Sequence, residues 1–293
     1  MNWIQWRLNV AEQNLELLEQ SLLDSGAASI TYQNAGEHSV LEPDPGEFRL
    51  WDDLTLIALF DGTVDTKAIE KNISSLDVWS IVKSSKWELL EDKDWVRAWM
   101  DDYHPMQFGR NLWICPTGQQ PPQPDATNLF LDPGLAFGTG THPTTALCLE
   151  FLDGAIVGGE TIIDYGCGSG VLALAAAKLG AKEIIGVDHD SQAVIATNEN
   201  AKRNHLDRGH IKVFTPEEFQ PFAADGVLAN ILAATLKQLA PEIVKLVKSG
   251  GWIALSGILE SQIESVLAAY QPWFDMSEPI LMDEWVLLTG TKY

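Results

Sequence analysis

The first ninety residues alternate between two periods of apolar positions. From Trp3 to Val10 the apolar side chains fall mostly on every second residue, which is typical of a half-buried strand. Leucines over residues 15–22 then follow a helical spacing. This order predicts a small α+β domain of the βαββαβ (ferredoxin-like) type over residues 1–90. Its later elements are predicted as strands over 29–33 and 54–60, a helix over 65–75, and extended segments over 79–82 and 87–90.

The segment 91–107 has an amphipathic helical pattern with acidic residues at both ends. Trp95 and Trp99 stand four residues apart and therefore share one helix face. Pro105 ends the pattern because proline cannot continue a helical hydrogen-bond ladder. The segment predicts a linker helix, which is either a packed connector or a mobile lever between two domains.

From about Leu129 onward, strand-like and helix-like stretches alternate regularly. This alternation predicts a doubly wound, Rossmann-like α/β domain with a parallel sheet, which we place at residues 108–293. The predicted strands lie at 161–164, 183–187, 226–230, 252–256 and 285–290. Helices are predicted at 171–179, at 191–204 and from the end of the strand 226–230 through 248.

Charge narrows the range of partners. The chain has 293 residues, of which 46% are apolar, so it can bury a sizeable core. Its 41 acidic residues against 19 basic ones leave a formal net charge of −22. A surface this negative repels phosphate backbones and anionic membranes and attracts basic proteins. We therefore expect no direct nucleic-acid partner.

The sequence carries no recognisable targeting or metal-binding pattern. Its start lacks a basic region followed by an apolar run, and no stretch of about 18 apolar residues exists. The cysteines at 115, 148 and 167 are too few and too scattered for a disulfide framework or a zinc site. We expect a soluble, reduced, cytoplasmic protein with no metal ion and no membrane contact.

A glycine-rich turn follows the first strand of the larger predicted domain. Asp164 is followed by Gly166, Gly168 and Gly170 and then directly by a helix. Glycines at the carboxyl end of such a strand let the backbone pass close beneath a ligand. A dinucleotide fingerprint needs glycine at the sixth place, where Val171 stands. The tighter G-x-G-x-G turn resembles the first motif of S-adenosylmethionine methyltransferases.

Two polar residues end the neighbouring strands. Asp188 stands 22 residues after Gly166, where an acid can accept both hydroxyls of a ribose, in either NAD or S-adenosylmethionine. The alternative role for Asp188 is to cap the following helix, for which Asp190 is better placed. Asn230 ends the strand predicted over 226–230, where a polar residue can receive the hydrogens of an amine being methylated. Its alternative is a buried amide that satisfies backbone groups only. The prolines and aromatic of an N-P-P-[YF] motif are missing, which argues against a nucleobase or glutamine target.

The most specific stretch is the loop over residues 132–145, which is rich in glycine and threonine and contains His142. Its composition predicts a ligand-binding loop that leads into a helix near Thr144. The threonine hydroxyls and the free N–H groups of this helix start are suited to the carboxylate of a methionine-like cofactor.

These motifs together resemble the PrmA family, the bacterial methyltransferases of ribosomal protein L11. The resemblance covers essentially the whole chain and rests most strongly on residues 137–145. It also includes residues 91–95, 166–170, 230–232 and 256–259. In this family a proline commonly follows the second acid after the ribose-binding strand. Ser191 stands there instead, which affects a helix start rather than the site.

The resemblance implies transfer of methyl groups from S-adenosylmethionine to lysine side chains and the N-terminal α-amino group of that basic ribosomal protein. The implied catalytic residues are Asn230, His142 and Phe137, the last two shaping the donor pocket and the amine channel together with Thr141. The N-terminal domain would dock the substrate. The implied cofactor-binding residues are Thr141, Thr145, Asp164, Gly166, Gly168, Asp188 and Asn230.

Methyl transfer to nitrogen requires an uncharged amine. The motifs contain no strong buried general base, so proton loss to water is our working hypothesis, with His142 as proton acceptor the alternative. The negative charge predicts attraction of the free ribosomal protein rather than the assembled subunit. A hinge in residues 91–107 would let several sites of one substrate reach the cleft.

Three other functions stay open at this stage. A methyltransferase acting on another basic protein would look much the same outside the family motifs. A nicotinamide-dependent dehydrogenase on the same scaffold is disfavoured by Val171 at the sixth place of the glycine turn. A non-catalytic cofactor-binding module is the third.

Overall fold

The computed structural model describes residues 3–10, 15–34, 54–90, 104–132, 142–206 and 209–293. Internal contacts divide the chain into two compact units, Met1–Ala98 and Trp99–Tyr293. The division falls within the predicted linker, of which residues 91–103 lie outside the described residues. Met106 and Gln107 belong to a strand, so the predicted linker helix does not extend to residue 107.

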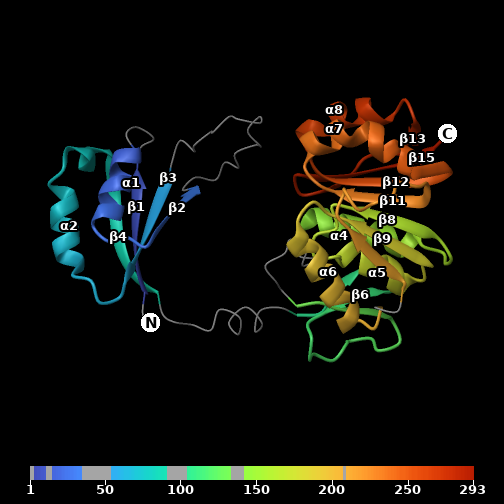
Figure 1. The fold of residues 1–293 in the computed structure, drawn as a ribbon, viewed down its shortest axis with the longest axis horizontal. Coiled ribbons are helices and arrows are strands. Elements are labelled where there is room, and N and C mark those ends of the chain that lie inside the picture. The colour runs from blue at the N-terminus through green and yellow to red at the C-terminus, as the bar shows by residue number, and fades with distance from the viewer. Residues whose placement is uncertain (1–2, 11–14, 35–53, 91–103, 133–141, 207–208) are drawn as a thin grey trace. The chain divides into compact units, whose positions relative to one another are not determined.

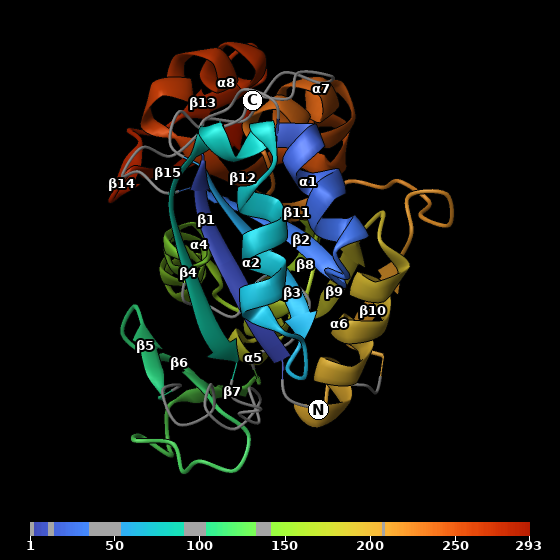
Figure 2. The same ribbon diagram turned by 90° about the vertical axis from the view of Figure 1, so that its left-hand side faces the viewer.

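The N-terminal unit is a four-stranded antiparallel sheet in the order β2-β3-β1-β4, covered on one face by two helices (Figures 1 and 2). The order of elements along the chain is the predicted βαββαβ order. The elements are β1 (Trp3–Val10), α1 (Leu15–Asp24), β2 (Ser29–Asn34), β3 (Leu54–Asp61), α2 (Thr66–Ser74), the 3₁₀ turn η1 (Asp77–Ile81) and β4 (Val82–Leu90).

Alternation along β1 builds the core of this unit. Trp6, Leu8 and Val10 are fully buried, whereas Arg7 and Asn9 between them are half-buried. The Trp6 ring stacks on Trp87 of β4 at 4.7 Å. The predicted extended segment over 79–82 was wrong for its first three residues, which lie in η1. Local hydrogen bonds, such as that from the N–H of Trp79, override the strand-like composition there.

The C-terminal unit begins with a small sheet that the sequence pattern did not predict. It contains β5 (Met106–Phe108), β6 (Leu112–Cys115) and β7 (Thr127–Phe130), in that order. These strands are three or four residues long, which is too short for a clear hydrophobic period.

The large sheet has eight strands, and its main path runs β10-β9-β8-β11-β12-β15-β13, with β14 paired to β15. Its strands are β8 (Thr161–Tyr165), β9 (Glu183–Val187), β10 (Ile211–Phe214), β11 (Ala224–Asn230), β12 (Val247–Leu259), β13 (Phe274–Met276), β14 (Ile280–Met282) and β15 (Trp285–Lys292). The pairings from β10 through β12 are parallel, and those of β15 are antiparallel. The expected parallel sheet is therefore corrected to a mixed one, parallel from β10 to β12 and antiparallel at β15.

Helices cover both faces of this sheet (Figure 1). The side chains of α4 and α5 contribute to one apolar core, which α6 joins through Ala201, and those of α7 and α8 contribute to the other. The helices are α4 (Pro143–Ala155), α5 (Val171–Leu179), α6 (Ser191–Arg203), α7 (Ala233–Ile243) and α8 (Ile263–Tyr270), with 3₁₀ turns η2 (Val244–Leu246) and η3 (Glu260–Gln262). None of the helices in the described ranges combines the length and apolar character needed to cross a bilayer.

The strand order reverses between β8 and β11. From β8 the chain moves outward through β9 to β10, and it then returns to the other side of β8 as β11 and β12. Open α/β sheets bind ligands in the crevice at the carboxyl ends of the strands beside such a reversal. The predicted helix through Lys248 was too long, because Val247 already pairs with Ala224 as the first residue of β12.

Candidate active site

The glycine turn joins the carboxyl end of β8 to the start of α5. The N–H of Gly166 donates to the carbonyl of Val187 on β9 at 2.7 Å. Gly166 has a left-handed φ of +81°, which glycine adopts without strain. A Cβ at this position would collide with the side chain of Ile231, which follows β11. The turn therefore lies against the neighbouring strand end only because residue 166 has no side chain.

A second glycine also meets Ile231. Gly257 lies in β12, where the pairing with β15 shifts register, and has a φ of +82°. A Cβ there would collide with the backbone of Ile231. The chain directly after Asn230 is thus held against two positions that lack a side chain.

Asp164 is buried in β8, with 1% of its surface exposed. Its Oδ2 accepts a hydrogen bond from the N–H of Ala173 at 3.0 Å, whereas its buried Oδ1 has no partner among the residues that the structure describes. Burial raises the pKa of Asp164 to about 7, the hydrogen bond from Ala173 opposes this shift, and the Asp188 carboxylate adds to it. A buried carboxyl oxygen without a partner costs free energy, so this position suits a ligand that brings a donor or a cation.

Asp188 links the end of β9 to the glycine turn. Its Oδ2 accepts from the N–H of Gly168 at 2.8 Å, and its Oδ1 accepts from the N–H of Asp190 at 2.9 Å. Each carboxylate oxygen can accept more than one hydrogen bond, so both keep acceptor capacity. The predicted cap of α6 is confirmed as Asp190, whose side chain accepts from Gln192.

Asn230 is the last residue of β11 and meets α4. Its Nδ2 donates to Oγ1 of Thr145 at 3.4 Å, and Thr145 is fully buried. The Asn230 amide thus donates to the side chain of Thr145 on α4 and not to a neighbouring backbone group.

His142 is the N-cap of α4. Its Nδ1 accepts from the N–H of Thr144 at 3.3 Å and lies 2.8 Å from Oγ1 of the same residue. The ring packs edge-on against Trp285 of β15 at 4.8 Å. Burial lowers the pKa of His142, and the negative charge of Glu284 partly offsets this. The neutral imidazole is therefore favoured at pH 7.

These residues surround a cleft of about 720 Å³ at the strand reversal. The cleft has an acidic residue beside the glycine turn, an amide at the end of β11, and mainly apolar walls. Its lining residues include His142, Tyr165, Gly166, Asp188, Pro216, Asn230, Ile231, Leu232, Leu239, Glu242 and Trp285.

Most of the site residues expected from the sequence meet around this cleft. His142, Gly166, Asp188 and Asn230 line it, Thr145 bonds Asn230, Gly168 bonds Asp188, and Asp164 lies two residues before Gly166. Phe137 and Thr141 lie outside the described residues.

Several residues that line the cleft were not predicted as site residues, among them Pro216, Glu242 and Trp285. These three come from the loop after β10, from α7 and from β15. The predicted start of a strand at Trp285 was the only signal, and it did not place that strand beside the cleft.

A known protein family matches this chain over almost its whole length. The family model described as "Ribosomal protein L11 methyltransferase (PrmA)" matches residues 2–293. The ribosomal protein L11 methyltransferase of Klebsiella pneumoniae is 49% identical over 294 residues, which cover 100% of both chains. This chain belongs to the ribosomal protein L11 methyltransferase family.

Other members of the ribosomal protein L11 methyltransferase family agree with this assignment. The relative from Shewanella amazonensis is 47% identical and covers 100% of this chain and 99% of its own length. The crystal structure of the ribosomal protein L11 methylase from Lactobacillus delbrueckii subsp. bulgaricus has a TM-score of 0.59 at 32% identity, covering 65% of this chain and 99% of that chain. The resemblance drawn from the motifs is thereby confirmed, and the dehydrogenase hypothesis has no support.

Proposed function

We propose that this chain transfers methyl groups from S-adenosylmethionine to lysine side chains and the N-terminal α-amino group of ribosomal protein L11. The arrangement of three neighbouring strand ends carries the proposal. Asp164 on β8 has a buried oxygen that no group in the described part of the chain contacts by a hydrogen bond, Asp188 follows β9, and Asn230 ends β11. Family membership supports the same reaction.

The residues of the cleft fit this cofactor. When bound, S-adenosylmethionine supplies a methyl group on a positively charged sulfur. The remaining acceptor sites of Asp188 suit the two ribose hydroxyls. The Oδ1 of Asp164 suits the cofactor's ammonium group, because a nearby cation stabilises the ionised carboxylate.

The acceptor amine must lose its proton before it reacts. A lysine with a pKa of about 10.4 is neutral at pH 7 at a cost of about 4–5 kcal/mol, whereas an α-amino group with a pKa near 8 costs about 1 kcal/mol. The apolar side chains of Ile231, Leu232 and Trp285 in the cleft favour the neutral amine by removing water from it. Holding the nitrogen in line with the methyl group lowers the barrier by a further ~7 kcal/mol.

Asn230 is the residue that we assign to the amine. Because its Nδ2 donates to Thr145, its Oδ1 remains to accept an amine hydrogen. His142 uses Nδ1 to cap α4, and in that tautomer Nε2 carries the proton. We therefore assign proton loss to water and give His142 a role in capping α4 and shaping the cleft with Trp285.

The N-terminal unit is proposed to dock the substrate, and its βαββαβ sheet to be of the ferredoxin-like type. The net charge of −22 would attract a basic ribosomal protein in the cytoplasm over long range and more weakly at high salt. We propose that the free protein is preferred, since the RNA of an assembled subunit carries the same sign of charge as this enzyme.

Intact-mass spectrometry of ribosomal protein L11 tests the proposal. The protein is incubated with this enzyme and S-adenosylmethionine, once free and once within the large ribosomal subunit. Multiple methyl increments on the free protein are expected. Increments only on the assembled subunit would contradict the charge argument, and no increments in either sample would contradict the substrate assignment.

A further inference from the structure

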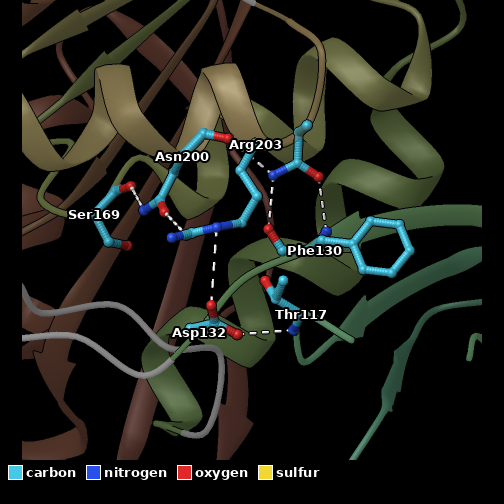
Figure 3. A network of polar contacts seen from close by, with 7 residues as sticks. Thr117, Phe130, Asp132, Ser169, Asn200 and Arg203 are labelled. Carbon is cyan, nitrogen blue, oxygen red and sulfur yellow. Dashed lines mark hydrogen bonds and ion pairs between the residues drawn. The ribbon is translucent and has the colours of Figure 1, made fainter. Parts of the chain in front are cut away.

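Helix α6 presents polar side chains on its buried face. Thr197, Asn200 and Asn204 are each at most 8% exposed, at positions where a helix that packs on a sheet normally has apolar residues. All three are hydrogen-bonded to backbone carbonyls of other segments. Figure 3 shows Asn200 and Arg203 reaching from this helix toward the chain below it.

Two of these side chains bind the glycine turn. Thr197 Oγ1 donates to the carbonyl of Gly168 at 2.9 Å, and Asn200 Nδ2 donates to the carbonyl of Ser169 at 2.9 Å. These bonds lie on the carbonyl side of the turn, whereas the N–H of Gly168 faces Asp188. The turn is thereby fixed from both sides.

The same helix binds the chain that leads into the loop motif. Asn204 and Phe130 exchange two hydrogen bonds of 2.7 Å, one with each backbone group of Phe130. Asp132, the first residue of the motif, accepts from the N–H of Thr117 at 2.7 Å through Oδ1 and faces Arg203 Nε at 3.8 Å through Oδ2 (Figure 3).

Arg203 connects the two attachments. Its Nη1 donates to Oδ1 of Asn200, whose Nδ2 holds Ser169, while its Nε pairs with Asp132. Two nitrogens of the planar guanidinium thus contact the Asn200 amide and the Asp132 carboxylate, whereas a lysine ammonium would have to reach both from a single nitrogen.

We propose that Asp132 and Arg203 are positioning residues for the cofactor, which hold the start of the 132–145 motif and the glycine turn in one fixed relation through Asn200. Neither residue lines the cleft. They act on S-adenosylmethionine through the two segments that they join. The inference rests on the proposed function, because it assigns both segments to the binding of that cofactor.

The test measures cofactor affinity in the full-length chain by isothermal titration calorimetry. Arg203→Gln and Asp132→Asn are each expected to weaken S-adenosylmethionine binding about fivefold to tenfold. The double variant is expected to bind no more weakly than the more affected of the two single variants, because both substitutions break the same connection. The KM for the cofactor rises to match, while kcat and the KM for the protein substrate change less than about twofold. Arg203→Lys, which keeps the charge but not the planar fork, is expected to lie in between.

Lys248→Gln is the matched control. It removes another partly exposed ion pair of the same unit, Lys248–Asp225 at 2.7 Å, which does not touch the cleft. Its cofactor affinity is expected to equal that of the wild type, with a melting temperature similar to that of Arg203→Gln.

Two results would overturn the inference. They are single variants that bind the cofactor within about twofold of the wild type, and a double variant whose losses multiply. A wild-type chain that binds no S-adenosylmethionine would instead overturn the proposed function, and this inference with it.

Discussion

The side-chain amide of Asn230 lies 3.4 Å from the hydroxyl of Thr145, so the end of β11 meets the first turn of α4 across 85 residues of sequence. The NH₂ group of the amide is turned toward Thr145. In the proposed reaction, the carbonyl end of Asn230 accepts from the substrate amine. The family resemblance implies cofactor contacts for both residues and a catalytic role for Asn230, and we propose that Thr145 serves only to position the Asn230 amide.

Replacing Asn230 with Ala tests this division. We expect kcat for methylation to fall about 100-fold, the loss typical of removing one well-placed polar group. Thr145→Val should cost about tenfold or less, because the Asn230 oxygen remains. Single-turnover methylation measured by mass spectrometry gives both values. Equal losses in the two variants would contradict the assignment.

Asp188 and Asp190 form a matched pair for cofactor binding. Asp188→Asn should weaken S-adenosylmethionine binding by about tenfold or more, since an NH₂ group would then face the N–H of Gly168 or of Asp190. Asp190→Asn should leave the affinity unchanged, because asparagine caps a helix as well as aspartate does. Calorimetric titration of both variants decides the matter, and a loss in Asp190→Asn alone would remove Asp188 from the site.

Cofactor binding should depend on pH through Asp164. Burial raises the pKa of this carboxyl to about 7, so below that pH the unliganded chain holds it protonated. A cationic cofactor favours the ionised form, so its affinity should weaken as pH falls below about 7, by up to tenfold per pH unit. Titrations in two buffers of different ionisation enthalpy should detect proton release, which Asp164→Asn should abolish.

The same carboxyl affects folding in the opposite sense. Because its folded pKa lies above the ordinary value of 3.8, Asp164 lowers the free energy of unfolding progressively as pH rises from about 4 to about 7. Denaturant unfolding without cofactor should show Asp164→Asn to be less sensitive to pH over this range. An unchanged pH dependence in the variant would assign the effect to other groups.

His142 gives a prediction about proton transfer. His142→Asn and His142→Gln should each leave the pH dependence of kcat unchanged, because Nδ1 of the histidine caps α4 by accepting from the N–H of Thr144. His142→Asn should also keep the melting temperature closer to that of the wild type, since asparagine is a strong N-cap. A lost acidic limb in the pH–rate profile of both variants would make His142 the proton acceptor.

The parts of the site that follow one strand were predictable from the sequence. Gly166 comes directly after a buried apolar strand, and Asp188 directly follows the next one, so a local pattern locates both. Pro216, Glu242 and Trp285 reach the cleft from elements whose neighbours are decided by strand order. A period of apolar residues identifies β15, but its antiparallel position beside β12 arises from packing of the whole sheet.

The predicted end of the helix after β11 was wrong because residues that continue its helical pattern belong to the next strand. The helical pattern after β11 continues through Val247 and Lys248, yet Val247 pairs with Ala224, and Lys248 binds Asp225 at 2.7 Å. Both contacts come from the neighbouring strand and have no signal in the local period. The three short strands of the small sheet escaped prediction for a related reason, since each depends on its partner more than on its own composition.

Gly166 and Gly257 both contact Ile231, but only at residue 166 could a substitution of Ile231 make room for a side chain. At residue 166 an added Cβ would strike the Ile231 side chain, so a smaller residue at 231 would remove the clash and leave only the strain of a left-handed backbone. At residue 257 the added atom would strike the backbone of Ile231, which every amino acid shares. Residues 166 and 231 are therefore expected to vary together among descendants of this chain, whereas no change at 231 can release 257 from glycine.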